Sequence, residues 1–392
     1  MSTVVVSAHQ VVEFPGGGGH FSAYVQYVHG LRELGCDVWW LERITPSGDH
    51  AADAHRIAAL TARLEGAGLR DRLIVYSGES DERRSYLTLD EREAERIFRE
   101  AELLVNFHYE IDTDLLRHFS RTSLVDIDPG LLQLWIDEGH LHVADHDVYF
   151  TTGETVGTAA ARFPSCGLDW LHIRPPVSLA QWPFAKEAPS RGFTTVSSWW
   201  GDEWMTDGKG EPWYENNKRV TFLEYAALPP LVAAPLELAI NSGPGDAADI
   251  GLLEGHGWRL RHTRDVAATP EAYRDYVRSS QGEFSCAKPS CMRLQNAWIS
   301  DRTVCYLASG RPAVVQHTGP NAALDGGDGL ARFRSLQEAA DGINRIAGDY
   351  ERQRSAAREL AETHFDARKV AAAILDGALS ARASQRSENA SA

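Results

Sequence analysis

A histidine follows four consecutive glycines near the start of the chain. Gly16–Gly19 and His20 stand between a first apolar run, TVVVSA, and a stretch with apolar residues at helical spacing. The dipole at a helix start keeps an imidazole neutral, so His20 is a candidate general base. Glycines let a ligand approach the backbone, so the candidate binding residues here are Gly17, Gly18 and Gly19. A flexible turn with a capping histidine is the alternative, because the run matches the dinucleotide-binding pattern GxGxxG only weakly.

Further candidates stand at the ends of strand-like runs in the first half. The segment VDIDPG contains Asp126 and Asp128, which we take as candidate catalytic residues. Such a pair can orient a histidine or bind an acceptor, and in other folds Asp-x-Asp binds a metal. Asp128-Pro129-Gly130 is also ordinary turn chemistry, so we predict no metal site. His108 ends the run LLVNFH, at the sheet edge where open α/β folds bind ligands, and is a candidate acceptor residue.

The segment 283–319 carries the most specific pattern in the chain. Ser300 is a good helix N-cap, and Asp301 follows it in the first turn. A helix N-terminus can bind an anion, and Lys288 and Arg302 lie close to this one in sequence. The next strand ends in an amide, an imidazole and a hydroxyl that could meet a polar ligand, from Gln316, His317, Thr318 and Gly319. A buried helix with surface charges is the alternative.

A tryptophan-rich segment, SSWWGDEW, follows the first strand-like run of the second half. It begins with Ser197, which we take as a candidate donor-binding residue at a strand end. Trp199 and Trp200 could stack on a ring or a sugar face of the acceptor. Plain packing between domains explains these aromatic residues equally well.

Composition excludes several classes of function. The chain has 392 residues, of which 43% are hydrophobic and 24% charged, and this suits two globular domains. A net charge of −16 argues against nucleic acid as a partner. We find neither a signal peptide nor an apolar run of the roughly 20 residues that span a bilayer, so we expect a cytoplasmic protein without membrane contact. The five cysteines include no CxxC pair, so we expect reduced thiols. Only five of the 39 basic residues are lysines, which makes each lysine notable.

Strand-like and helix-like segments alternate along both halves of the chain. The strand-like runs of the first half are 3–8, 37–42, 72–77, 103–108, 123–128 and 147–152. Those of the second half are 193–199, 236–241, 258–262, 283–288 and 312–317, and helices follow near 336–347 and 350–379. Alternation of this kind predicts an α/β protein with doubly wound parallel sheets.

A stretch rich in proline and tryptophan, 173–192, has no period and joins the two halves. We therefore predict a first Rossmann-like domain over 1–183 and a second over 184–365. A C-terminal helix follows over 366–379, for which a return to the first domain is one option. The polar tail 380–392 is expected to be disordered.

With these segments described, the chain resembles bacterial GT-B glycosyltransferases through the motif YLASGRPAVVQHTG. A narrower group of them shares four patterns: D-x-DPG, a WxxxRPPV-like linker, an EFSxAK strand and an SDRxxxYLASGRP segment. Here they stand at 126–130, 170–177, 283–288 and 300–319. The resemblance covers nearly the whole chain and implies two Rossmann-like domains that face a cleft.

The resemblance also implies roles for the second-domain candidates. The co-substrate would be a nucleoside diphosphate sugar, with Lys288 and Arg302 paired to the diphosphate. The helix end at Ser300 would add backbone donors, and Gln316–Gly319 would meet the sugar.

On the first domain, the glycine loop would lie on the acceptor side and His20 would be the general base. Retaining members often carry two glutamates where this chain has Ala297 and Cys305, so we expect an inverting enzyme. We expect no metal or other cofactor, because the cations and the helix end can stabilise the leaving diphosphate.

Other functions compete with transfer to a small-molecule acceptor of the kind found in secondary metabolism. A nucleotide-sugar epimerase would want several carboxylates beside the sugar, and few surround Gln316. A non-catalytic nucleotide-sugar-binding partner could keep Lys288 and Arg302 without using His20. A solute-binding protein would need an export signal. The acceptor, the sugar, the nucleotide base and the oligomeric state stay open.

Overall fold

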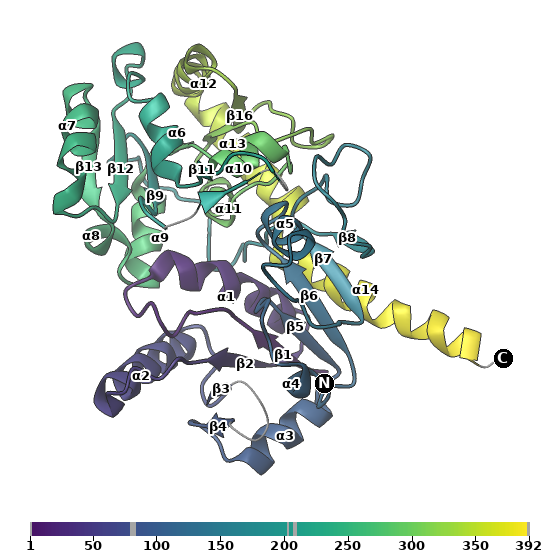
Figure 1. The fold of residues 1–392 in the computed structure, drawn as a ribbon. Helices are drawn as coiled ribbons and strands as arrows, with labels where there is room; N and C mark the ends of the chain where they lie inside the picture. The colour runs from purple at the N-terminus through teal and green to yellow at the C-terminus, as the bar shows by residue number, and fades with distance from the viewer. Residues whose placement is uncertain (1, 79–83, 202–203, 207–209, 390–392) are drawn as a thin grey trace.

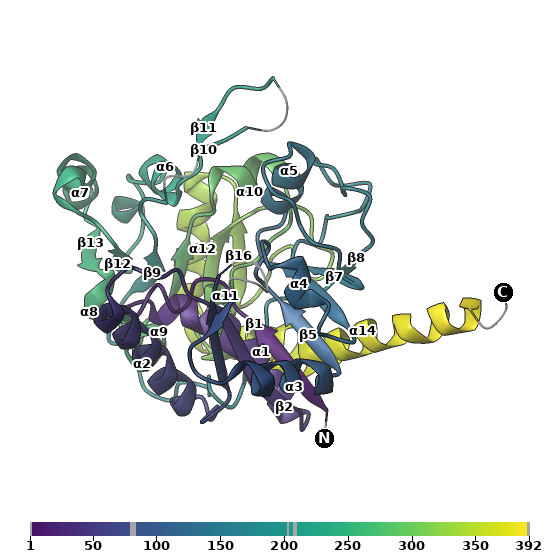
Figure 2. The same ribbon diagram turned by 60° about the horizontal axis from the view of Figure 1, so that its bottom comes forward.

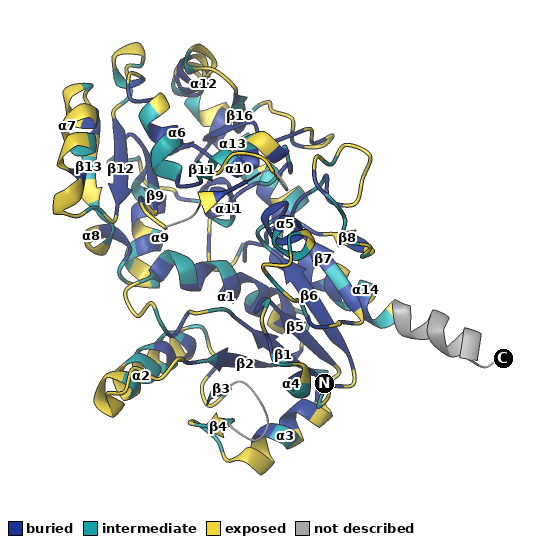
Figure 3. Cartoon of the chain, viewed as in Figure 1, coloured by how far each residue is buried: buried dark blue, intermediate teal, exposed yellow. Residues whose placement is uncertain are grey.

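The computed structural model describes residues 2–78, 84–201, 204–206 and 210–389, and their side chains as far as residue 380. It contains two extended sheets, one in each half of the chain (Figure 1). The strands are buried, and the helices packed around them turn exposed faces to solvent (Figure 3). The α/β prediction is confirmed. None of the described helices is long and apolar enough to cross a lipid bilayer.

The first sheet has the order β4-β3-β2-β1-β5-β6-β7-β8, and every pair except β3–β4 is parallel. Its strands are β1 (Thr3–Ser7), β2 (Asp37–Arg43), β3 (Leu73–Ser77), β4 (Ser85–Tyr86), β5 (Leu103–Asn106), β6 (Thr122–Asp126), β7 (Val148–Thr151) and β8 (Trp170–His172). Its helices are α1 (Gly18–Glu33), α2 (His50–Gly66), α3 (Glu91–Glu100), α4 (Thr113–Leu116) and α5 (Leu131–Asp137). The strand order reverses between β1 and β5, and such a switch point is where open α/β sheets bind ligands.

The second sheet is parallel throughout, with the order β13-β12-β9-β14-β15-β16. Its strands are β9 (Phe193–Ser197), β12 (Leu236–Ile240), β13 (Arg259–His262), β14 (Gly282–Ser285), β15 (Ala313–Gln316) and β16 (Leu330–Phe333). The helices are α6 (Lys218–Glu224), α7 (Ala247–Gly255), α8 (Thr263–Ala267), α9 (Pro270–Ser279), α10 (Pro289–Leu294), α11 (Asp301–Ala308), α12 (Leu336–Gly348) and α13 (Tyr350–Leu360). Counted along the chain this is the Rossmann order 3-2-1-4-5-6, with its switch point between β9 and β14. A small hairpin, β10 (Trp204–Met205) and β11 (Tyr214–Glu215), forms a separate sheet.

Helix α1 positions the glycine–histidine segment. It begins after Gly17, and Gly35 follows its end with a φ of 86°, a conformation that glycine adopts without strain. The predicted apolar stripe is buried in the first-domain core and consists of Phe21, Tyr24, Val25, Val28 and Leu31. The buried stripe holds α1 on the sheet and directs its first turn to the carboxyl edge of the strands.

The chain crosses between the two domains twice. The segment between β8 and β9 makes the first crossing and includes the boundary predicted at residues 183–184. After α13, a π-helical turn over Ala361–Phe365 leads back to the first domain. The two crossings are hydrogen-bonded side by side: Val177 donates to Phe365 O at 2.7 Å and accepts from the Ala367 N–H at 3.0 Å.

The last helix, α14 (Ala367–Asn389), packs on α1 of the first domain, and its last turns extend away from both domains (Figures 1 and 2). Gly30 permits the contact, since a Cβ there would lie 2.1 Å from Ala367 O. The first part of the tail predicted to be disordered from residue 380 continues α14 to Asn389. Alanine, arginine, glutamine and glutamate favour helix, and the stretch contains no glycine or proline. Residues 390–392 of the predicted tail lie outside the described residues.

Candidate functional site

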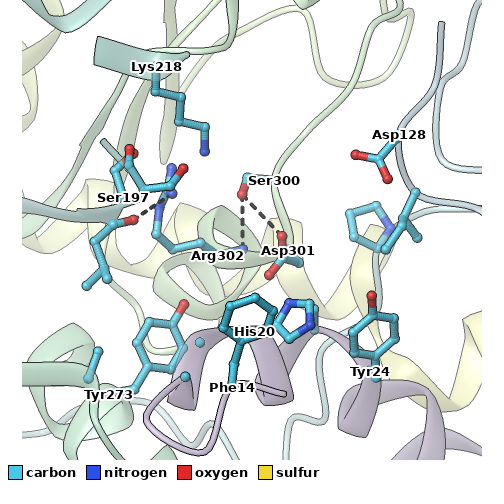
Figure 4. A pocket seen from close by; sticks show the side chains of 18 of the residues that line it. Phe14, His20, Tyr24, Asp128, Ser197, Lys218, Tyr273, Ser300, Asp301 and Arg302 are labelled. Carbon is cyan, nitrogen blue, oxygen red and sulfur yellow. Dashed lines mark hydrogen bonds between the residues drawn. The ribbon is translucent and has the colours of Figure 1, made fainter. Parts of the chain in front are cut away.

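A cleft of about 850 Å³ lies between the carboxyl edges of the two sheets. Both domains line it, and Figure 4 shows side chains from each pointing into the same space. Nine of the residues singled out from the sequence line the cleft: Gly17, Gly19, His20, Asp128, Ser197, Lys288, Ser300, Asp301 and Arg302. The structure therefore brings together residues that are up to 285 positions apart, from Gly17 to Arg302.

His20 lies half-buried in the first turn of α1. Its Nε2 atom is 3.0 Å from the carbonyl oxygen of His9. Because a carbonyl only accepts hydrogen bonds, Nε2 must carry the proton, and Nδ1 of the neutral ring is then an acceptor. Burial lowers the pKa of His20 below its ordinary value, which keeps the ring neutral near pH 7. A neutral imidazole with an unprotonated nitrogen is the form that a general base requires.

Asp126 ends β6 and Asp128 follows it, but the two carboxylates serve different purposes. Asp128 lines the cleft, and its Oδ2 accepts a hydrogen bond from the Tyr109 hydroxyl at 3.1 Å. The Asp126 carboxylate is fully buried and accepts three hydrogen bonds, from Thr151 Oγ1 at 2.8 Å, Gln133 Nε2 at 2.9 Å and the Asp128 N–H at 3.0 Å. Burial raises the pKa of Asp126 to about 7. Asp126 is therefore corrected from a catalytic candidate to a residue that shapes the turn presenting Asp128.

Two lysines reach the cleft from the second domain. Lys288 is the N-cap residue of α10, and Lys218 begins α6 with its ammonium 5.8 Å from the Trp298 ring centroid. Burial, together with the nearby Arg302 and Lys288, lowers the pKa of Lys218 to about 7. Cations crowded in this way favour an anionic ligand, because an added negative charge relieves their repulsion.

Arg302 is buried at the floor of the cleft. Its Nε donates to Glu283 Oε1 at 2.6 Å, and its Nη1 donates to Val196 O at 2.8 Å. Its Nη2 donates to Ser285 Oγ. These contacts use three of the five guanidinium N–H groups and fix the plane of the side chain. The guanidinium is thus a rigid part of the cleft floor, and its other two N–H groups make no hydrogen bond within the described part of the chain.

The N-terminus of α11 also faces the cleft, as the sequence predicted. Ser300 caps the helix by accepting the Arg302 N–H at 3.2 Å, and its hydroxyl lies 3.4 Å from Asp301 Oδ1 (Figure 4). The helix end supplies backbone donors and a partial positive charge. Ser197 ends β9 on the same side of the cleft.

Comparisons with solved structures match this arrangement over nearly the whole chain. An α-glucosyltransferase in complex with UDP and DNA matches with a TM-score of 0.59 at 11% identity, over 96% of this chain and 99% of that one. AviGT4, a glycosyltransferase of avilamycin A biosynthesis, matches with a TM-score of 0.57 at 14% identity, over 96% and 97%. The pneumococcal O-GlcNAc transferase GtfA in complex with UDP and GlcNAc matches with a TM-score of 0.56 at 8% identity, over 97% and 99%. The fold is GT-B. No family model and no curated protein sequence matches the chain.

In this GT-B chain the QHTG segment supports the cleft from behind. Gln316, His317, Thr318 and Gly319 do not line it. Gln316 Oε1 accepts the Ala287 N–H at 2.9 Å, and His317 Nε2 lies 2.8 Å from Asp325. Thr318 donates to Trp298 O at 2.6 Å, and a Cβ on Gly319 would lie 2.4 Å from Gln295 O. The predicted contact with the sugar is corrected: Thr318 and Gly319 brace the loop before α11, and Gln316 holds the backbone that precedes α10.

The glycine run holds the two GT-B domains close together. A Cβ on Gly18 would lie 2.5 Å from Thr269 O and 2.7 Å from Ala267 O, both in the second domain. Gly18 is therefore corrected from an acceptor contact to a point of domain packing. Gly17 and Gly19 line the cleft, where the prediction that they bind the acceptor stays a prediction.

Three other acceptor candidates lie outside the cleft. His108 is buried behind His9, with ring centroids 4.9 Å apart, and burial lowers the pKa of His108 to about 3. Trp199 is buried in the second-domain core, where its Nε1 donates to Asp249 at 3.2 Å. Trp200 is 47% exposed and donates to Asp246 at 2.6 Å, outside the cleft. The acceptor assignments of His108, Trp199 and Trp200 are thus corrected, because the first two are buried away from the cleft and Trp200 pairs with Asp246 on the surface.

Sequence reasoning missed several residues that line the cleft. Lys218 could have been found from the sequence, because lysine is scarce in this chain and each lysine is therefore notable. Tyr24 and Tyr27 belong to a helix face whose pattern indicates core, and Asn296 and Trp298 stand in a loop without a motif. Within the described part of the chain no cluster of three or more His, Cys, Asp or Glu side chains could hold a metal ion.

Proposed function

We propose that the protein transfers a sugar from a nucleoside diphosphate sugar to the hydroxyl group of a small molecule. One observation carries the proposal: Lys218, Lys288, Arg302 and the α11 N-terminus face His20 across a single cleft. The neighbours in complex with UDP, and those with a sugar as well, support a donor of this kind. We take UDP as the first nucleotide to test for the same reason.

The second domain would hold the donor. Lys288, Lys218 and the free N–H groups of Arg302 would contact the diphosphate, and the backbone donors of α11 would complete the anion site. As the bond to the sugar breaks, negative charge grows on the leaving diphosphate. Preorganised cations in a site of low dielectric constant stabilise that charge without reorganisation.

The first domain would activate the acceptor. Nδ1 of His20 would take the hydroxyl proton as the acceptor oxygen attacks the anomeric carbon. We infer an inverting reaction by direct displacement, because Ala297 and Cys305 are buried and apolar where retaining relatives of the resembled group often carry glutamates. We also infer that no metal is needed, and full activity in excess chelator is the expected result.

We propose a small molecule rather than nucleic acid as the acceptor, although two of the matching structures are complexes of an α-glucosyltransferase with DNA. The net charge of −16 gives the protein a field that repels phosphate backbones. AviGT4 offers a parallel, since it is a glycosyltransferase involved in the biosynthesis of avilamycin A.

Calorimetry with UDP and a UDP-sugar tests the donor site. Lys288→Ala should weaken UDP binding by about 1.5–3 kcal/mol, the usual contribution of a charge-assisted hydrogen bond. Lys186→Ala is the matched control, because Lys186 is exposed and lies outside the cleft. Arg302→Ala is less clean, since it leaves Glu283 buried without its ion-pair partner and should destabilise the fold.

Two outcomes would count against the proposal. Equal UDP affinity in the Lys288→Ala variant and the wild type would contradict the assignment of the donor site. UDP binding without release of sugar to any acceptor or to water would instead favour the non-catalytic binding partner.

A further inference from the structure

Phe14 presents a bare aromatic ring to the cleft. It precedes the glycine run, lines the cleft and is 51% exposed. Figure 4 shows its ring beside His20, and the two ring centroids are 5.5 Å apart, edge to face. Tyr24 contacts the other side of His20 in the same manner at 5.3 Å. The proposed base thus lies between two aromatic rings on the first-domain wall.

Much of the surrounding wall is apolar as well. The cleft-lining residues near the carboxyl edge of the first sheet and on the first crossing include Ile127, Pro129, Pro175 and Pro176, and Pro15 adjoins Phe14. When a ligand covers exposed apolar surface in a cleft, removal of that surface from water favours binding. Such a wall favours a ligand that is itself largely apolar.

Two polar side chains of the same wall, Glu13 and Thr152, are engaged within the protein. Glu13 accepts the Thr45 N–H at 2.8 Å through Oε1 and pairs with Arg56 through Oε2. The Thr152 hydroxyl donates to Asp126 O at 3.2 Å. A carbohydrate acceptor needs several polar side chains that are ready to exchange water for sugar hydroxyls, and groups already paired gain little from that exchange.

We propose that the acceptor is a flat aromatic molecule with a hydroxyl group, a phenol, that packs against Phe14 with its hydroxyl at Nδ1 of His20. This inference rests on the proposed function. The phenol oxygen forms a bond to the anomeric carbon, and the bond from that carbon to the diphosphate oxygen breaks. The phenol proton passes to Nδ1 of His20, and the nucleoside diphosphate leaves with the electron pair.

Phe14 belongs to the acceptor side because of how its loop is held. The Arg63 guanidinium donates to Phe14 O at 3.3 Å and also to Pro15 O, which fixes the loop to α2 of the first domain. The lysines proposed to hold the donor stand on the second domain. A ring on the first domain can therefore stack on the acceptor without contributing to nucleotide affinity.

Equilibrium binding to the full-length protein, with and without UDP, tests the inference with 4-methylumbelliferone as a flat phenol and methyl glucoside as a sugar. The phenol should bind at least about tenfold more tightly than the glucoside. Phe14→Ala should weaken phenol binding about tenfold, since aromatic stacking and burial are both lost, while Phe14→Tyr should retain it. Leu252→Ala is the control, because it removes a side chain that is 46% exposed and outside the cleft.

Several results would overturn the phenol acceptor. They are tighter binding of the glucoside, binding of neither probe, unchanged phenol affinity in Phe14→Ala, or a loss of UDP affinity in that variant. A protein that binds the phenol through Phe14 but never binds UDP would contradict the proposed function and leave the aromatic site standing.

Discussion

At the level of single residues, replacement of His20 should separate chemistry from binding. His20→Ala should lower the rate of transfer by about 10²–10⁴, the usual contribution of a positioned base. UDP affinity should stay nearly unchanged, because the donor cations stand on the other domain. Steady-state kinetics with both substrates varied, together with calorimetry, measures the two effects.

The pH profile adds a second test of His20. The wild-type rate should fall as the pH drops through the pKa of His20, since the protonated ring cannot accept a proton. Burial lowers that pKa, so the fall should come at lower pH than for an ordinary histidine, and His20→Ala should lose it. If the variant raises the acceptor KM with kcat intact, His20 only lines the pocket, and Asp128 becomes the candidate base.

Lys218 should make nucleotide binding take up a proton. With a pKa of about 7 in the free protein, its side chain is mostly uncharged at pH 8. A bound diphosphate favours the ammonium form and raises the pKa, so UDP binding at pH 8 should draw a proton from the buffer. Calorimetry in two buffers of different ionisation enthalpy measures this uptake. Lys218→Arg, charged at every pH, should abolish the difference between buffers, and a difference that persists would assign the uptake to another group.

Site features that depend on residues close together in the sequence could be predicted, and features that depend on distant residues could not. The cap at Ser300 and the helix start at His20 depend on neighbours in sequence, so the local sequence pattern predicts both. The positions of Gln316 and Trp199 depend on the Ala287 backbone and on Asp249, which local patterns do not encode. A strand-end rule locates the edge of a sheet but not which side chain there faces the ligand.

Among the elements, the contact between α1 and α14 offers a clean test of packing. Gly30→Ala would place a Cβ 2.1 Å from Ala367 O, so the backbone of one helix must shift, and we expect a loss of about 1–3 kcal/mol in the free energy of unfolding. Gly66→Ala, at the exposed end of α2 with nothing within 4 Å, is the matched control. It should be neutral or stabilising by up to about 1 kcal/mol. Urea denaturation measures the free energy of unfolding of both variants. Equal effects would contradict the close packing of α14 on α1 at Gly30.

The elements themselves were largely predictable, because continuous apolar runs are typical of strands buried on both faces. All eleven strand-like runs contain a strand, whereas the short edge strands β4, β8 and β16 and the β10–β11 hairpin were missed. The helix predicted over 350–379 is interrupted at Ala361–Phe365 without any glycine or proline. The hydrogen bonds to Val177 explain the interruption, and they join residues almost 190 positions apart.

At the scale of the whole molecule, the first domain is completed by the end of the chain. Val370, Ala371 and Ile374 belong to its core, and Arg121 donates to Ala378 O at 2.9 Å. A chain that ends at residue 365 should therefore aggregate or unfold at a markedly lower temperature, because it exposes this surface. A chain that ends at residue 380 should keep the wild-type melting temperature. Thermal unfolding and size-exclusion chromatography compare the two, and equal behaviour would show that α14 adds nothing to the first domain.

The paired crossings at Val177 and Ala367 also limit how the halves of the molecule can move. A single connecting segment would let one domain rotate freely relative to the other. Here two connecting segments are joined by hydrogen bonds, and Pro175 and Pro176 stiffen one of them. We expect the pair to resist twisting of one domain against the other and to permit bending between them. If the domains move by bending at these paired segments, His20 should return to the same place opposite α11 each time the cleft closes.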